Sequence, residues 1–303
     1  MRFNRLDLNL LVALDALLAE RSVTRAAARL NLSPSATSDA LARLRAYFDD
    51  ELLVQVGRRM EPTPRAEGLG AAVRDMLVRV DATITTPPQF DPAMTERCFR
   101  IFASDYTQMV LMPHLMRRIA AARCTARFEI LPQVADPQRD LERGEADLLI
   151  LPTALLSPSH PQQTLYTEDF VCAIWADSPL ARQPLTVESY LAADHVVMRP
   201  QSTTSDSYED WFVKRAGVRR RVVATSYGFA TVPALLIGTP FVATMHRRLA
   251  SLLAAVWPLA LRPCPLDVPP MQQGAQWHRY RTHDPGLTWL LTQLQAGADG
   301  LPP

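Results

Sequence analysis

The first sixty residues place hydrophobic side chains at helical spacing. Leucines at positions 10, 11, 14, 17 and 18 mark one face of a helix from about residue 7 to residue 18. A second helix is predicted over residues 24–30, with Ser22 as its cap. A third follows Ser33, the predicted cap, with Pro34 at its first position, where the fixed φ of proline suits a helix start. Its buried stripe is predicted to be Thr37, Leu41, Leu44 and Phe48.

Residues 51–63 change to an alternating pattern. The stretch "ELLVQVGRRMEPT" turns at Gly57 and predicts a small β hairpin with Arg58 and Arg59 at its tip. Two guanidinium groups at such a tip could reach the minor groove or the backbone of a DNA duplex.

A long helix is predicted to follow the hairpin. Thr63 is its expected cap and Pro64 its first residue, and "TTPP" ends it. Apolar residues recur along it at spacings of four, three and four: Leu69, Val73, Met76 and Val80. Because an isolated helix cannot bury such a stripe, we expect it to pair with another helix in a dimer.

From about residue 90 short apolar runs alternate with helical patterns. This alternation predicts two α/β lobes with mostly parallel, Rossmann-like sheets. The predicted division is a three-helix domain with a hairpin over 1–62, a linker helix over 63–89 and an α/β domain over 90–303. Within the last, lobe I comprises about 90–164 and 268–303, and lobe II about 165–267, because the final strand and helix are expected to return to the first lobe.

Charge is informative only where it is local. The chain of 303 residues has a net charge of +1, so it is not a polycation. Residues 21–45, however, hold five arginines against Asp39 alone. The face of the third helix opposite its buried stripe carries small or charged side chains: Ser35, Asp39, Ala42 and Arg43.

Helix pair, exposed polar face and arginines together favour a winged helix-turn-helix, whose second helix enters the major groove. The alternative is a trihelical unit with a hairpin that is only structural, and the joint pattern disfavours it. The predicted DNA contacts are Arg25, Ser33, Pro34, Ser35, Ser38, Asp39, Arg43, Arg58 and Arg59.

The chain resembles the LysR-type transcriptional regulators over nearly its whole length. The segment "LDLNLLVALDALLAERSVTRAAARLNLSPSATSDALARLRAYFDDELLVQVGRRMEPTPRAE" is similar to their winged helix-turn-helix. The segments "LERGEADLLI", "VATMHRRLA" and "QWHRYRTHDPGLTWL" resemble their effector-binding portion, especially in the nodulation and aromatic-degradation branch. Many members carry glutamine where this chain has Pro34, so base reading is expected to depend on Ser35, Ser38 and Asp39.

The resemblance implies a DNA-binding regulator that is not an enzyme. It assigns DNA binding to residues 1–62, dimerisation to the linker helix over 63–89, and effector binding and regulation to residues 90–303. The expected partners of such a regulator are an inverted-repeat operator, RNA polymerase, a small-molecule effector and further copies of the chain, as dimers that commonly pair into tetramers. An aromatic or carboxylated effector is favoured.

Effector contacts are predicted at strand ends and helix starts, where ligands collect in α/β folds. Hydroxyl groups and free helix amides there would suit a polar ligand group. Ordinary capping or core packing is the alternative for each residue. The candidates are Ser104, Asp105, Tyr106, Phe170, Thr203, Thr204, Tyr227, Thr244 and His246.

Other functional classes have little support. No nucleophile elbow, zinc-protease helix or P-loop is present, and the histidines and four cysteines form no metal-ligand pattern, so neither a metal nor a cofactor is expected. The leucine-rich start is interrupted by Asp7, Asn9 and Asp15 and is expected to be folded, which predicts a cytoplasmic protein without a membrane segment. A solute-binding protein, an enzyme with a DNA-binding appendage and a regulator without an effector remain alternatives.

Overall fold

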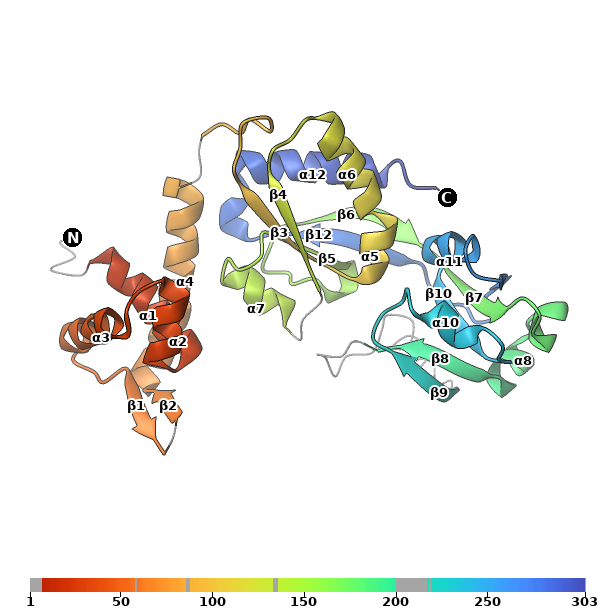
Figure 1. Cartoon of the computed structure of the whole chain (residues 1–303), viewed down its shortest axis with the longest axis horizontal. Coiled ribbons are helices and arrows are strands. Elements are labelled where there is room, and N and C mark those ends of the chain that lie inside the picture. The colour runs from red at the N-terminus through yellow and green to blue at the C-terminus, as the bar shows by residue number, and fades with distance from the viewer. Residues whose placement is uncertain are drawn as a thin grey trace. The chain divides into compact units, whose positions relative to one another are not determined.

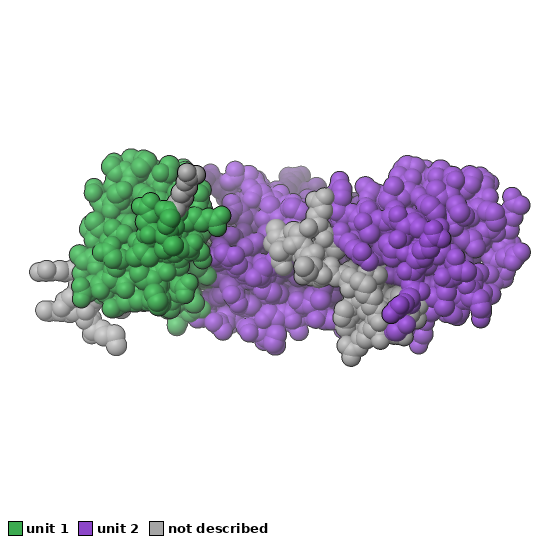
Figure 2. Space-filling view, turned by 90° about the horizontal axis from the view of Figure 1, so that it is seen from below, with its two compact units in different colours: residues 1–86 green, residues 87–303 purple. Residues whose placement is uncertain are grey.

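The computed structural model describes residues 7–57, 59–85, 88–132, 136–199, 217 and 219–302. The chain forms two compact units, Met1–Thr86 and Pro87–Pro303, coloured green and purple in Figure 2. Each unit has a hydrophobic core of its own.

Unit 1 is a helical domain with a two-stranded sheet (Figure 1). Its elements are α1 (Leu8–Glu20), α2 (Val23–Leu30), α3 (Pro34–Phe48), β1 (Leu53–Val56), β2 (Arg59–Pro62), α4 (Pro64–Val80) and the π-helical turn η1 (Asp81–Thr85). The predicted caps are confirmed: the side chains of Ser22, Ser33 and Thr63 accept the amides of Arg25, Ala36 and Ala66. The hairpin turns at Gly57, whose φ of 62° is a left-handed value that glycine adopts without strain.

The first half of helix α4 belongs to the core of unit 1. Val73 is buried and Leu69 packs beside it in the same cluster as the leucines of α1. The two helices are also joined by an ion pair, with Arg74 Nε 3.1 Å from Asp15 Oδ1. The first half of the α4 stripe is therefore covered within unit 1, where it packs against α1. Met76, in contrast, remains 42% exposed.

Lobe I of unit 2 is built on one five-stranded sheet in the order β4-β3-β5-β12-β6. Its strands are β3 (Cys98–Ala103), β4 (Arg127–Leu131), β5 (Leu148–Pro152), β6 (Gln162–Glu168) and β12 (Met271–Gln276). Its helices are α5 (Asp105–Val110), α6 (Met112–Ala121), α7 (Pro137–Glu142), η2 (Thr153–Leu155), η4 (Arg279–Arg281) and α12 (Pro285–Ala298). Helices α6 and α12 pack against each other, as Figure 1 shows.

Lobe II holds the second sheet, in the order β11-β7-β10-β8-β9. Its strands are β7 (Phe170–Trp175), β8 (Asp194–Met198), β9 (Arg221–Ser226), β10 (Val242–His246) and β11 (Leu259–Pro263). Its described helices are η3 (Pro179–Arg182), α8 (Val187–Ala192), α10 (Val232–Leu236) and α11 (Arg247–Ala254). One cluster of buried apolar side chains includes residues of both lobes, so the lobes share a core.

The two-lobed α/β prediction is confirmed, but the sheets are mixed rather than mostly parallel. Strand β12 runs antiparallel to both β5 and β6, and β7 runs antiparallel to β10 and β11. The chain crosses between the lobes twice, after β6 and before β12, and the strands next to these crossings run against their neighbours. Residues 165–168, predicted to open lobe II, pair in the first sheet, which places the crossing at Asp169.

Candidate nucleic-acid interface and ligand site

The polar face of α3 is exposed, as its sequence indicated. Thr37, Leu41 and Leu44 are buried, and the residues on the opposite face lie in solvent. The exposed members of the predicted set on this helix are Ser33, Pro34, Ser35, Ser38, Asp39 and Arg43. The Ser33 hydroxyl accepts the Ala36 amide at 3.2 Å and lies 2.9 Å from the hydroxyl of Ser35. The result is a convex, hydroxyl-bearing surface of the kind that fits the major groove.

Carboxylates from outside residues 21–45 accompany the arginines that made this segment look strongly basic. Arg25 Nε lies 3.4 Å from Glu20, and Arg43 lies 3.7 Å from Asp7. Over residues 1–86 twelve arginines face eleven acidic residues, so the local excess does not extend to the whole unit. Exposed ion pairs of this kind contribute only about 0–1 kcal/mol to stability. The guanidinium groups can therefore leave these carboxylates and bind DNA phosphates instead.

Arg45 has a structural role that its charge did not suggest. Its Nε donates to the Glu51 carbonyl and its Nη2 to the Leu53 carbonyl, each at 2.8 Å. These bonds fix the start of the hairpin to the end of α3. Arg59 is exposed at the hairpin, whereas Arg58 lies outside the described residues.

The candidate ligand site begins at the loop between β3 and α5. Ser104 caps α5, because its hydroxyl accepts the Thr107 amide at 3.2 Å. Asp105 Oδ2 accepts the backbone amide of Ala230, in lobe II, at 2.8 Å. The predicted loop therefore lies at the junction of the two lobes, with Asp105 already engaged by a donor from the protein itself.

Three further candidates come together as packed aromatic side chains. The ring of Tyr106 stacks on His246 with centroids 3.9 Å apart, and Phe170 lies 5.2 Å from His246. All three are buried. Burial lowers the pKa of His246 to about 3 and raises the pKa of Tyr106, because the interior disfavours either charge. In this arrangement they form core between the lobes and do not line an open site.

Two of the remaining candidates, Thr244 and Tyr227, are described by the structure. The Thr244 hydroxyl lies 2.8 Å from the Tyr190 hydroxyl, inside lobe II. Tyr227 is 68% exposed. Thr203 and Thr204 lie outside the described residues.

Sequence reasoning missed two buried polar groups. Glu168 is fully buried and accepts the hydroxyl of Tyr106 at 2.6 Å. His195 is equally buried, and its Nε2 lies 2.8 Å from the Tyr190 carbonyl. Burial lowers the pKa of His195 to about 4. A signal for Glu168 existed, since a carboxylate stands inside the strand-like run "TLYTEDFVCAIW".

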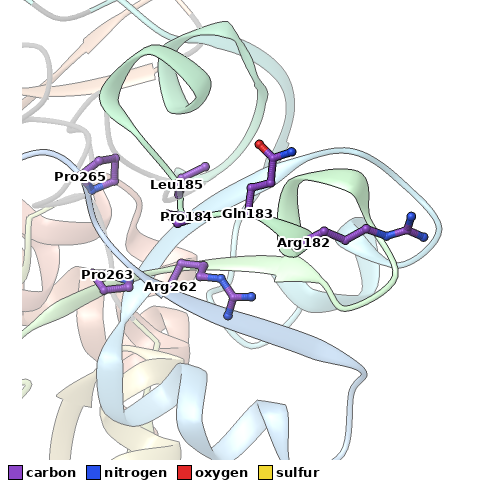
Figure 3. Close-up of a pocket in the computed structure, with 7 residues that line it drawn as sticks. All are labelled: Arg182, Gln183, Pro184, Leu185, Arg262, Pro263 and Pro265. Carbon is purple, nitrogen blue, oxygen red and sulfur yellow. The ribbon is translucent and has the colours of Figure 1, made fainter.

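Two shallow hollows on unit 2 include none of the predicted contacts. One, of 420 Å³, lies between η3 and β11, where Figure 3 shows Arg182 extending away from the surrounding prolines. The other, of 480 Å³, lies between α6 and α12 and is lined by His114 and Arg117. Across the part of the chain that the structure describes, no helix is both long and apolar enough to cross a membrane.

Comparisons with known families cover nearly the whole chain. Residues 8–67 match the family described as "Bacterial regulatory helix-turn-helix protein, lysR family". Residues 94–299 match the family described as "LysR substrate binding domain". The first match contradicts the alternative of a solute-binding protein that stands alone.

Curated relatives match along nearly their full length. The Nodulation protein D 1 of Rhizobium leguminosarum bv. phaseoli is 39% identical over 302 residues, covering 100% of this chain and 96% of the relative. The Nodulation protein D 2 of the same organism is 40% identical over 290 residues, covering 96% and 91%.

Solved structures are similar to this chain over nearly its whole length. A probable transcriptional regulator from Pseudomonas aeruginosa is 33% identical, with a TM-score of 0.64 over 96% of this chain and 97% of that one. Full-length OxyR from the same organism, 17% identical, shares the fold with a TM-score of 0.73 over 98% and 96% of the two chains.

Proposed function

The chain belongs to the LysR family of bacterial regulatory helix-turn-helix proteins, and from this premise we propose how its two units divide the work. It is a DNA-binding transcriptional regulator that acts as an oligomer and responds to a small molecule, not an enzyme. We propose that unit 1 reads the operator and that unit 2 senses the effector.

The exposed hydroxyl face of α3 is the observation that carries the DNA-binding assignment. Ser35, Ser38 and Asp39 read base edges in the major groove, while Arg43 holds a phosphate. Pro34 has no amide to offer and contributes shape only. Around the helix, Arg25 binds the backbone, and Arg58 and Arg59 act from the wing. Twofold symmetry of the dimer matches an inverted-repeat operator.

Arg43→Ala tests this assignment. Duplex DNA from upstream of the protein's own gene is titrated with the full chain at several salt concentrations. Loss of one phosphate contact is expected to weaken binding and to reduce the salt slope by about 1. The matched control is Arg100→Ala, which also removes an exposed arginine paired with a carboxylate, Glu129 at 3.0 Å, but in unit 2. If Arg43→Ala binds like the unchanged protein with the same salt dependence, or if Arg100→Ala weakens binding equally, the assignment of a phosphate contact to Arg43 fails.

The effector site is proposed at the junction of the lobes, where the β3–α5 loop meets the segment after β9. Ser104 and Tyr227 supply exposed or half-buried polar groups there. Thr203, Thr204 and Thr244 are kept as contacts suggested by the sequence. Tyr106, Phe170 and His246 are proposed to support this site from behind. The effector itself is proposed to be an aromatic or carboxylated compound.

Effector binding is proposed to shift the population of lobe arrangements, which respaces the DNA-binding units and alters access of RNA polymerase. A cytoplasmic location follows from access to the chromosome.

A thermal-shift titration with benzoate as the probe tests for a site of this class. A ligand that binds only the folded state raises the melting temperature with concentration. Benzoate and other aromatic carboxylates that all leave it unchanged would favour a regulator of the same family without such an effector.

A further inference from the structure

The first turn of α5 makes contacts in both lobes. Asp105 Oδ2 accepts the Ala230 amide of lobe II, and Oδ1 accepts the Tyr106 amide at 3.0 Å. The carboxylate rests against Gly228, where a Cβ would lie only 2.9 Å from Oδ2. A glycine therefore permits the close approach of the β9–α10 loop to Asp105.

Tyr106, the next residue, reaches the crossing between the lobes. Its ring stacks on His246, the last residue of β10. Its hydroxyl donates to Glu168 Oε2 at 2.6 Å, and Glu168 is the last residue of β6 before the chain enters lobe II. All three side chains are buried.

Glu168 joins this tyrosine to lobe II. Its Oε1 accepts the backbone amide of Arg248, in α11, at 3.1 Å, and Arg248 Nη1 lies 3.2 Å from Oε2. The neighbouring Arg247 amide donates to the Asp169 carbonyl at 2.8 Å. A buried carboxylate is stable only while it keeps such partners. A shift of Tyr106 that breaks its hydrogen bond to Glu168 therefore changes how Glu168 is held against α11 at the crossing.

We infer that Tyr106 is a positioning residue that links the effector site to the crossing between the lobes, acting through Glu168. This inference rests on the proposed effector site. Asp105 and Tyr106 share one helical turn, so a ligand that competes with Asp105 for the Ala230 amide displaces the Tyr106 hydroxyl as well. The hydrogen bond to Glu168 then carries that displacement to α11.

Hydrogen exchange tests the link in the full chain, without DNA or ligand. Asp105→Ala removes the acceptor for Ala230 and stands for the competing ligand. Mass spectrometry follows the peptides 228–232 and 246–250, which contain the Ala230 and Arg248 amides. Asp105→Ala is expected to speed exchange in both peptides, by about tenfold, the factor that corresponds to loss of one hydrogen bond to a charged group.

The double variant Asp105→Ala with Tyr106→Phe tests whether the Tyr106 hydroxyl carries the effect. Tyr106→Phe keeps the ring and its stack but removes the hydroxyl. In that background Asp105→Ala is expected to speed exchange at 228–232 only, with no further change at 246–250. Glu168→Gln, which keeps the side-chain shape, is expected to break the link in the same way. The inference would be overturned if Asp105→Ala sped exchange at 246–250 equally with Tyr106 and with Phe at that position. It would also be overturned if Asp105→Ala had no effect on 246–250 in either case.

Tyr190→Phe is the matched control. It removes another buried tyrosine hydroxyl with a short hydrogen bond, to Thr244, but both residues lie in lobe II. It is expected to leave the response of 246–250 to Asp105→Ala intact. If it removes that response as Tyr106→Phe does, the effect is general loosening and the inference fails. Because the assay contains no DNA, its failure does not bear on operator binding.

Discussion

At the residue scale, His246 shows how burial sets the charge of one side chain. It is enclosed by Tyr106, Phe170 and Phe229, and its Nδ1 has no hydrogen-bond partner among the described residues. Burial lowers its pKa to about 3. Above pH 6.5 the imidazole is neutral in both folded and unfolded chains. As the pH falls from 6.5 toward 3, only the unfolded chain gains the proton, so the free energy of unfolding decreases.

His246→Phe removes this titration and keeps an aromatic ring in the stack. Between pH 7 and pH 5 the unchanged protein is expected to lose about 2 kcal/mol more stability than the variant. The reason is that unfolding of the unchanged protein takes up a proton at His246, whereas the variant has no imidazole there. Urea unfolding at the two pH values measures the difference. An equal loss in both proteins would show that the imidazole protonates in the folded chain.

At the element scale, α12 is held to lobe I by its first cap. Asp284 Oδ1 accepts the Gly286 and Leu287 amides and lies 2.6 Å from Arg97 Nη1. Burial alone would raise the pKa of Asp284, but its hydrogen bond and attraction to Arg97 outweigh this and lower it. One side chain thus caps the helix and neutralises a half-buried arginine ahead of β3.

Asp284→Ala is expected to destabilise the fold by about 3 kcal/mol, because it removes the cap and leaves Arg97 with one partner fewer. Asp284→Asn keeps a good capping side chain and loses only the charge. Its free energy of unfolding is therefore expected to lie between those of the unchanged protein and Asp284→Ala. Chemical unfolding of the three proteins gives the order. An alanine variant as stable as the asparagine variant would mean that the cap contributes nothing.

At the scale of the whole molecule, the apolar side chains that unit 1 leaves exposed bear on oligomer formation. Helix α4 buries Val73 against α1 but leaves Met76 exposed, and Leu8 and Val12 of α1 are exposed too. A second copy of the chain can cover them, as the helical stripe in the sequence suggested.

Met76→Glu is expected to weaken self-association, since it places a charge on this surface. Light scattering over a range of concentrations measures the mass. The matched control is Met94→Glu, because Met94 is a highly exposed methionine in unit 2, 80% accessible. Identical masses for both variants at every concentration would remove Met76 from the interface.

Local interactions explain what could be predicted. Ser22, Ser33 and Thr63 were assigned as caps because a cap and its amide lie three residues apart, and the structure confirms all three. The exposed face of α3 followed from helical periodicity in the same way. The ion pairs that offset the arginines of unit 1, such as Arg43 with Asp7, were not visible in a count over 25 residues.

By itself the sequence determined the winged helix-turn-helix, the two-lobed plan and the family, since these depend on periodicity, caps and motifs within short stretches. Only the tertiary structure decided that Tyr106 and His246 are buried and that Asp105 bonds to lobe II. The reason is distance along the chain: Tyr106 and Glu168 are 62 residues apart, and Asp105 and Ala230 are 125 apart. Such contacts form only when two sheets meet at a crossing, and no local pattern encodes where that occurs.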